Sequence, residues 1–169
     1  MILLVRCDDR LVHGLVAVSW TSALQPETIL VANDDAAEDE FKAMTMKMAK
    51  PAGVKMFIKH LDKACNALNN PVNDNKRLFV VVDSVKDALY IHDHVKGVTK
   101  VNIGTAGVNK KPGVKYYPTL PQVYMTEEEF GYAKKLHEDG VDVFAQIYPT
   151  QDRMDYDELA KTMTKNINS

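Results

Sequence analysis

The chain has 169 residues, 46% of them apolar and 26% charged, which is enough apolar content for one domain with a sizeable core. A formal net charge of -2 gives no reason to expect a broad basic surface for nucleic acid. Cys7 and Cys65 make neither a metal-ligand pair nor a disulfide framework, and no apolar run approaches the roughly 20 residues that span a bilayer. We therefore expect a reduced, cytosolic protein.

The first half of the chain predicts alternating strands and helices. Residues 2–5 form a short apolar run typical of a buried parallel strand, and a polar loop at residues 7–10 follows, with Cys7 and Asp8. A helical pattern then begins near residues 11–14 and runs to about Leu24. Further strands are expected at residues 28–32, 54–58 and 78–82. Helices are expected at residues 38–49, with Phe41, Met44, Met48 and Ala49 at helical spacing, and at residues 61–68.

The second half continues the alternation. Ser84 is expected to cap a helix, residues 100–103 to form a strand, and residues 104–107 to form a flexible glycine loop. Residues 115–125 are extended but irregular, and Thr126 with Glu129 predicts a capping box for a helix that reaches about residue 139. A strand at 141–147 and a helix at 155–165 complete the chain. The pattern predicts an α/β fold in which residues 1–169 form a single domain with an open, mostly parallel sheet and helices on both faces.

The segment directly after the first strand carries the most chemical information. Ligands of open α/β folds bind beyond the carboxyl ends of the strands, where helix N-termini offer free amides to anions. There, His13 supplies an imidazole that is a competent nucleophile near neutral pH, and Arg10 supplies a permanently charged fork for phosphoryl oxygens. Asp8 or Asp9 could orient Arg10 or the imidazole. Taken alone, the same spacing is also compatible with an ordinary surface loop.

The order of residues in this segment resembles an active-site signature. Arg6, Asp8, Asp9, Arg10, Leu11, Val12, His13 and Gly14 match the pattern of the IIB subunits of the mannose–fructose–sorbose family of the bacterial sugar phosphotransferase system. The resemblance continues through nearly the whole chain, at Ser19-Trp20 and at residues 31–34, 51–55, 101–104, 136–141 and 149–150. Leu15 departs from it, standing where the family commonly has glutamine, and Cys7 replaces a common aliphatic residue.

This resemblance implies a function. Such subunits accept a phosphoryl group from a IIA phosphohistidine onto the residue matching His13, usually at Nδ1, and deliver it to a sugar held by the membrane subunits IIC and IID. The activity would be that of a protein-phosphohistidine–sugar phosphotransferase of the EC 2.7.1 type, with no cofactor or metal, in the cytoplasm at the inner face of the membrane. The residue matching Arg10 would stabilise the phosphoryl group. Supporting or phosphate-loop positions would be Arg6, Asp8, Asp9, Gly14, Asn33, Gly104 and Thr105.

Two alternatives use the same segment differently. A receiver-like regulatory module also places two acids after its first strand, here Asp8 and Asp9, to hold Mg²⁺. It needs a phosphoacceptor aspartate at the end of the third strand, and this chain has no acid there before Asp62. Direct phosphorylation of Cys7 is disfavoured because the adjacent acids oppose both the thiolate and a phosphorylated thiol.

Overall fold

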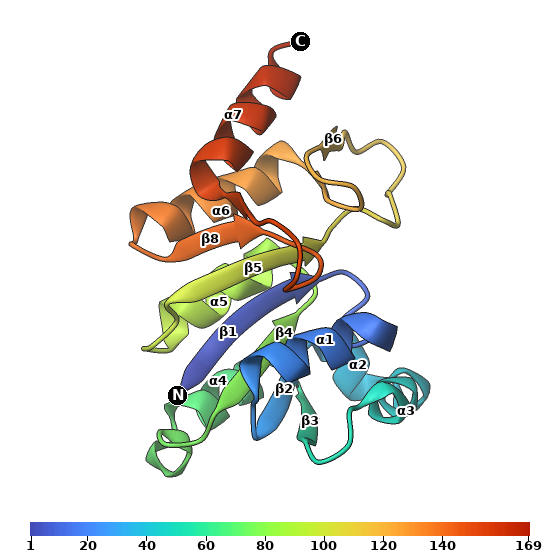
Figure 1. Ribbon diagram of the computed structural model, residues 1–169, viewed down its shortest axis with the longest axis vertical. Coiled ribbons are helices and arrows are strands. Elements are labelled where there is room, and N and C mark those ends of the chain that lie inside the picture. Colours follow the sequence, from blue (N-terminus) through green and yellow to red (C-terminus); the bar gives the residue numbers. More distant parts are fainter.

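The computed structural model describes residues 1–169 and contains one large, open sheet (Figure 1). Its strand order is β3-β2-β4-β1-β5-β8-β9, and every pairing is parallel except that of β8 with β9. A small antiparallel pair, β6 with β7, lies outside it. The strands are β1 Ile2–Asp8, β2 Thr28–Ala32, β3 Lys55–Lys59, β4 Leu78–Val82, β5 Lys100–Thr105, β6 Tyr117–Pro118, β7 Tyr124–Met125, β8 Asp142–Ala145 and β9 Met154–Asp155.

Helices cover both faces of this sheet, as the sequence predicts. One buried cluster joins a face of the central strands to α1 and α3, and a second joins the other face to α4, α5, α6 and α7. No helix is long and apolar enough to cross a membrane. The helices are α1 Gly14–Leu24, α2 Asp34–Glu38, α3 Glu40–Ala49, α4 Leu61–Asn69, η1 Pro71–Asn73, α5 Val85–His94, α6 Glu127–Glu138 and α7 Tyr156–Ile167.

The central strands are apolar on both sides because both sides are covered. Along β4, Val80 and Val82 belong to the cluster under α4 and α5, whereas Phe79 and Val81 belong to the cluster under α1. Each such side chain contributes about 1.5–3 kcal/mol when it is fully buried. This explains why the apolar runs at 28–32 and 78–82 predict β2 and β4 without error in their bounds.

Several boundaries differ from the sequence predictions. Strand β1 continues through Asp8, so Cys7 and Asp8 belong to the strand and not to the loop. Strand β5 likewise continues to Thr105, so the first half of the expected glycine loop is regular and buried. The helix expected at 38–49 is α3, which begins at Glu40 because the Asp39 carboxylate accepts hydrogen bonds from two of its amides and makes Asp39 its N-cap. Helix α2, directly before it, was not expected.

The helix caps connect elements that the sequence does not connect. Ser84 caps α5 as predicted, and Thr126 Oγ1 accepts the amide of Glu129. The Glu129 carboxylate, however, accepts the amide of Val85 at 2.9 Å and so links α6 to α5 in place of completing the capping box. Strand β9, at the far edge of the sheet, was not expected either.

The strand order brings three loop-bearing strand ends together. Strand β1 lies between β4 and β5, with which it pairs in parallel, so the segment after β1 lies beside the ends of both. Because such a position in an open parallel sheet is where ligands bind, the segment carrying His13 occupies the expected site of chemistry.

Candidate active site

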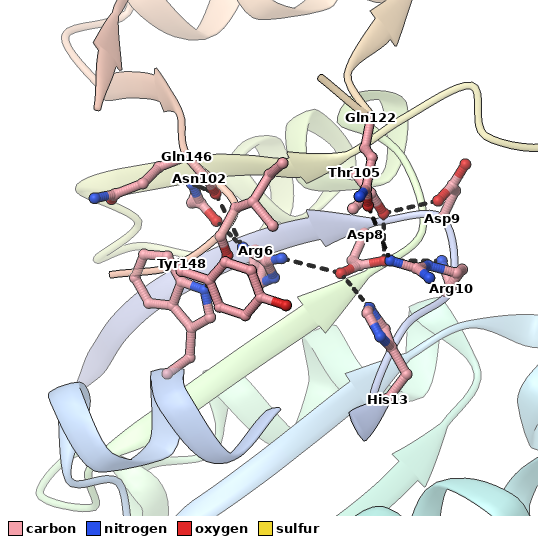
Figure 2. A network of polar contacts seen from close by, with 12 residues as sticks. Arg6, Asp8, Asp9, Arg10, His13, Asn102, Thr105, Gln122, Gln146 and Tyr148 are labelled. Carbon is pink, nitrogen blue, oxygen red and sulfur yellow. Dashed lines mark hydrogen bonds and ion pairs between the residues drawn. The ribbon is translucent and has the colours of Figure 1, made fainter. Parts of the chain in front are cut away.

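The Asp8 carboxylate is the centre of a buried polar network at the end of β1 (Figure 2). Its Oδ1 accepts the Arg10 amide at 2.9 Å and lies 2.5 Å from Thr105 Oγ1. Its Oδ2 accepts from Arg6 Nη2 at 3.0 Å and lies 2.9 Å from His13 Nε2. Both oxygens are therefore occupied by donors of the protein, which leaves this carboxylate poorly placed to bind the Mg²⁺ of a receiver-like site.

These contacts decide the charge of Asp8. Burial alone would raise its pKa, but the hydrogen bond with His13 and the charge of Arg6 outweigh burial and lower the pKa of Asp8 below its ordinary value. The group therefore stabilises the fold above the ordinary pKa of aspartate, and this contribution is lost as the pH falls through the lowered value. Asp8 is a carboxylate at neutral pH and can balance positive charge on the imidazole of His13.

Arg6 is a structural support of Asp8 and does not reach the surface. Its side chain is buried, and it donates from Nη1 to Asn102 Oδ1 at 2.6 Å and to the Gln146 carbonyl at 3.2 Å. Burial lowers the pKa of Arg6, although Asp8 opposes this effect. A buried charge is tolerated only when it is paired and hydrogen-bonded, so Arg6 and Asp8 stabilise each other and hold the end of β1 in place.

His13 occupies the N-cap position of α1 with its imidazole half-buried (Figure 2). The contact with the Asp8 carboxylate fixes the proton on Nε2, which leaves the Nδ1 lone pair available for attack. Nδ1 makes no hydrogen bond in the structure, and no acidic residue occupies the first turn of α1. The amides at the start of α1 lack intrahelical partners and favour negative charge at this position.

The turn between Asp8 and His13 is fixed on both sides. The Leu11 amide donates to the Asp8 carbonyl at 2.9 Å, and Leu11 has a left-handed φ of 57°, which is unfavourable for a leucine. Asp9 ties the turn to the end of β5: its Oδ2 accepts the Val108 amide at 2.9 Å, and its Oδ1 lies 2.8 Å from Thr105 Oγ1. The Thr105 hydroxyl has one hydrogen and so donates to Asp8 or Asp9, but not to both at once.

Two clefts border this turn, and their charges differ. One, of about 400 Å³, contains His13 and Arg10 together with Lys42 of α3, against the single acid Asp9. The other, of about 470 Å³, contains two lysines and four acids, namely Lys86, Lys111, Asp9, Asp83, Glu128 and Glu129. A phosphoryl dianion is attracted by the first and repelled by the second. These charges therefore favour binding of an anion on the α3 side of the turn.

The structure brings most of the sequence-predicted residues together at the end of β1 and places Asn33 apart from them. Arg6, Asp8, Asp9, His13 and Thr105 form one network, and Arg10 lies beside it with its guanidinium 3.3 Å from Gln122 Oε1. Gly14 begins α1 with a left-handed φ of 42°. Asn33 lies elsewhere: it caps α2 and donates to Asp83, without contacting the network.

Gly104 lies in strand β5 and not in the flexible loop that was expected. A Cβ at this position would lie 2.2 Å from Arg6 Cζ, so Gly104 makes room for the buried guanidinium. Cys7 is buried, and burial raises its pKa well above the ordinary value, which suits a packing residue.

Sequence reasoning missed the partners of Arg6 and the residues across the cleft. The Asn102 side chain, the Gln146 carbonyl and the Gln122 side chain are distant in sequence from the residues they contact, and only the fold brings them to Arg6 and Arg10 (Figure 2). Lys42 lies on a helix whose orientation toward His13 depends on how α3 packs. The one available signal was Asn102 itself, a polar residue within an otherwise apolar strand.

Comparison with known proteins identifies the family of this chain. The chain matches the model of the PTS system sorbose subfamily IIB component over residues 2–169. It is 38% identical over 161 residues to a probable phosphotransferase enzyme IIB component of Streptococcus pyogenes serotype M6, covering 94% of this chain and 99% of the relative. It is 32% identical over 114 residues, 68% of each chain, to the sorbose-specific EIIB component of Klebsiella pneumoniae.

A solved structure shows the same fold. The crystal structure of the IIBSor domain of the Klebsiella pneumoniae sorbose permease superposes with a TM-score of 0.87 at 25% identity, covering 96% of this chain and 98% of that one. The receiver-like alternative gains no support from any of these comparisons. The chain thus belongs to the sorbose-type IIB components of the sugar phosphotransferase system, and it is a phosphotransferase.

Proposed function

We propose that His13 takes a phosphoryl group from the phosphohistidine of a IIA protein and passes it to a sugar held by IIC and IID subunits. The activity is then that of a protein-phosphohistidine–sugar phosphotransferase, carried by residues 1–169 as one domain, in the cytoplasm at the inner face of the membrane. One observation carries this proposal. Asp8 holds Nε2 of His13, which leaves Nδ1 free on a residue that is the N-cap of α1 and lines the cationic cleft.

The geometry supports a simple transfer step. The Nδ1 lone pair of His13 attacks phosphorus, the P–N bond to the donor histidine breaks, and its electron pair returns to the donor imidazole. His13 then carries a positive charge on its ring, which the Asp8 carboxylate at 2.9 Å balances. Phosphoryl transfer needs mainly positioning and charge stabilisation, so the α1 amides and Arg10 can supply the rest without a metal.

Arg10 is expected to stabilise the equatorial oxygens of the transferring group. Its side chain is exposed and borders the cleft that contains His13, so Arg10→Lys should leave the fold unchanged. Lysine cannot make the bidentate grip, and we expect transfer from phospho-IIA to slow by about 10- to 100-fold in rapid-quench experiments. Arg153→Lys, a change of another arginine remote from the cleft, is the matched control. Equal rates for Arg10→Lys and wild type would remove Arg10 from the mechanism.

The proposed function is tested by locating the phosphate. After incubation with purified phospho-IIA in excess EDTA, intact-mass measurement should show one added phosphoryl group, and peptide mapping should place it on the peptide containing His13. The product should be labile in acid, as a phosphoramidate is. If EDTA stopped the reaction and the label mapped to an aspartate, the receiver-like function, which needs Mg²⁺ to neutralise the incoming charge, would replace the one proposed.

A further inference from the structure

The turn between β6 and β7 has an unusual residue in its centre. The Val123 amide donates to the Leu120 carbonyl at 2.9 Å, which closes a β-turn. Its two central residues are Pro121 and Gln122, and Gln122 has a left-handed φ of 67°. Proline first and a positive φ second are the arrangement of a type II turn, whose second position normally belongs to glycine or asparagine. Glutamine there costs conformational free energy that glycine would avoid, which indicates that the side chain has a function.

The Gln122 side chain contacts the arginine of the candidate active site. Its Oε1 accepts a hydrogen bond from Arg10 Nη2 at 3.3 Å, across 112 residues of sequence (Figure 2). Arg10 is exposed and lines the cleft that contains His13. Its guanidinium makes no other hydrogen bond or ion pair within the protein. The orientation of this guanidinium therefore depends on Gln122.

The turn that carries Gln122 is fixed to the sheet. The Ala106 amide, directly after β5, donates to the Gln122 carbonyl at 3.0 Å. Thr119 donates twice to the Val123 carbonyl, from its amide at 3.0 Å and from its hydroxyl at 2.8 Å. Strand β5 also pairs with β1, which leads directly into the active-site turn. The main chain of Gln122 is therefore held at the strand ends beside the site.

We propose that Gln122 is a positioning residue for phosphoryl transfer, which acts by holding the Arg10 guanidinium at the edge of the cleft. The inference rests on the proposed function, since it concerns the arginine that would grip the transferring group. An exposed arginine samples many rotamers, and it loses less freedom on binding phosphoryl oxygens when its guanidinium is already oriented. Gln122 thus lowers the entropic cost of reaching the transition state.

A neutral amide suits this task better than a carboxylate would. The amide oxygen occupies one of the five N–H donors of Arg10 and leaves its positive charge uncompensated, so the charge remains available to the incoming dianion. A carboxylate in the same place would form an ion pair with Arg10, and the phosphoryl group would have to compete with it. The hydrogen bond of 3.3 Å is also long, so stronger charge-assisted bonds to phosphoryl oxygens can replace it.

Two substitutions separate positioning from a purely structural role. Gln122→Gly removes the side chain and suits the left-handed φ, so its melting temperature should equal or exceed that of wild type. We nevertheless expect transfer from phospho-IIA to slow by about 3- to 10-fold in rapid-quench experiments. Gln122→Glu keeps the size of the side chain but adds a charge, and it should slow transfer at least as much.

Gln25→Gly is the matched control. Gln25 is also an exposed glutamine with a left-handed φ, 52°, but it caps the C-terminus of α1 and does not line the cleft. Its replacement by glycine should leave the transfer rate at the wild-type value. A Gln122→Gly protein that transfers as fast as wild type, or a Gln122→Glu protein that does so, would overturn the proposal.

A double-mutant cycle with Arg10→Ala decides whether Gln122 acts through Arg10. If it does, Gln122→Gly has no further effect once the guanidinium is absent, and the double variant transfers at the rate of Arg10→Ala alone. A further loss of about 3- to 10-fold in the Arg10→Ala protein would show that Gln122 acts by another route, and would overturn the proposal. Failure of the wild-type protein to be labelled on His13 would instead refute the proposed function itself.

Discussion

Replacement of His13 by alanine is expected to abolish phosphoryl acceptance from phospho-IIA. The side chain supplies the attacking Nδ1. Among the other groups that line the cleft, Arg10 and Lys42 are cations. The Asp9 carboxylate is bound by Thr105 and Val108, and the Thr45 hydroxyl donates to the Phe41 carbonyl. Intact-mass spectrometry after incubation with the donor measures the result directly. Stoichiometric uptake of phosphate by His13→Ala would refute the central role of this residue.

Two variants make this experiment specific. His60→Ala removes an imidazole from the start of α4 that is also close to a carboxylate, at 3.5 Å from Asp34, but lies outside the cleft. Cys7→Ser changes the buried residue next to Asp8 by one atom. Both should accept phosphate as wild type does. The His13→Ala protein itself should remain folded, since losing one hydrogen bond to a charged group costs about 1.5–3 kcal/mol, and a melting curve checks this.

Much of the fold follows from the sequence because its strongest signals are local. The runs at 28–32 and 78–82 are apolar throughout and buried on both faces, so strands β2 and β4 follow from their residues alone. The same reasoning fails for β1, which ends in Arg6, Cys7 and Asp8. From the sequence alone, the charged residues Arg6 and Asp8 indicate a loop. Their burial in a strand depends on the contacts of Arg6 with Asn102 and Gln146, which are 96 and 140 residues away from it.

The candidate site likewise has residues that the sequence predicts and residues that only the fold brings together. His13 and Arg10 could be found because they are close together in sequence and because their segment resembles a known signature. The opposite wall of the cleft could not be predicted from the sequence, because Phe41 and Lys42 line the cleft only through the way in which α3 packs. Gly104 was misread for a physical reason: glycine in a sequence suggests a flexible loop, whereas here it is required by the volume of a side chain from the neighbouring strand.

Gly104→Ala is expected to destabilise the protein by about 3 kcal/mol or more, despite being the smallest possible change at this position. Gly104 does not have a left-handed φ, so alanine meets no conformational penalty there. The conflict is one of space: the added Cβ would lie 2.2 Å from Arg6 Cζ and within 2.4 Å of both terminal nitrogens. Either β5 moves away from β1, or the guanidinium leaves its partners.

Displacement of the Arg6 side chain lowers the stability of the fold because the guanidinium loses its buried hydrogen-bond partners. Its terminal nitrogens bond Asp8, Asn102 and the Gln146 carbonyl, and a shift away from them leaves a buried charge unpaired on each side. The free energy of unfolding from urea titrations measures the loss. Gly131→Ala is the matched control: Gly131 is an exposed residue within α6, nothing lies within 4 Å of its Cβ position, and alanine should stabilise the helix by up to about 1 kcal/mol.

The two alanine variants should also differ in activity. If Gly104→Ala displaces Arg6, Asp8 loses the cation that helps to lower its pKa and fix its position, and the imidazole of His13 loses its alignment in turn. Phosphoryl acceptance under conditions where the variant is still folded should then fall, whereas Gly131→Ala should transfer at the wild-type rate. A Gly104→Ala protein as stable and as active as wild type would contradict the close packing of Arg6 against β5, and with it the support that Arg6 is inferred to give to Asp8.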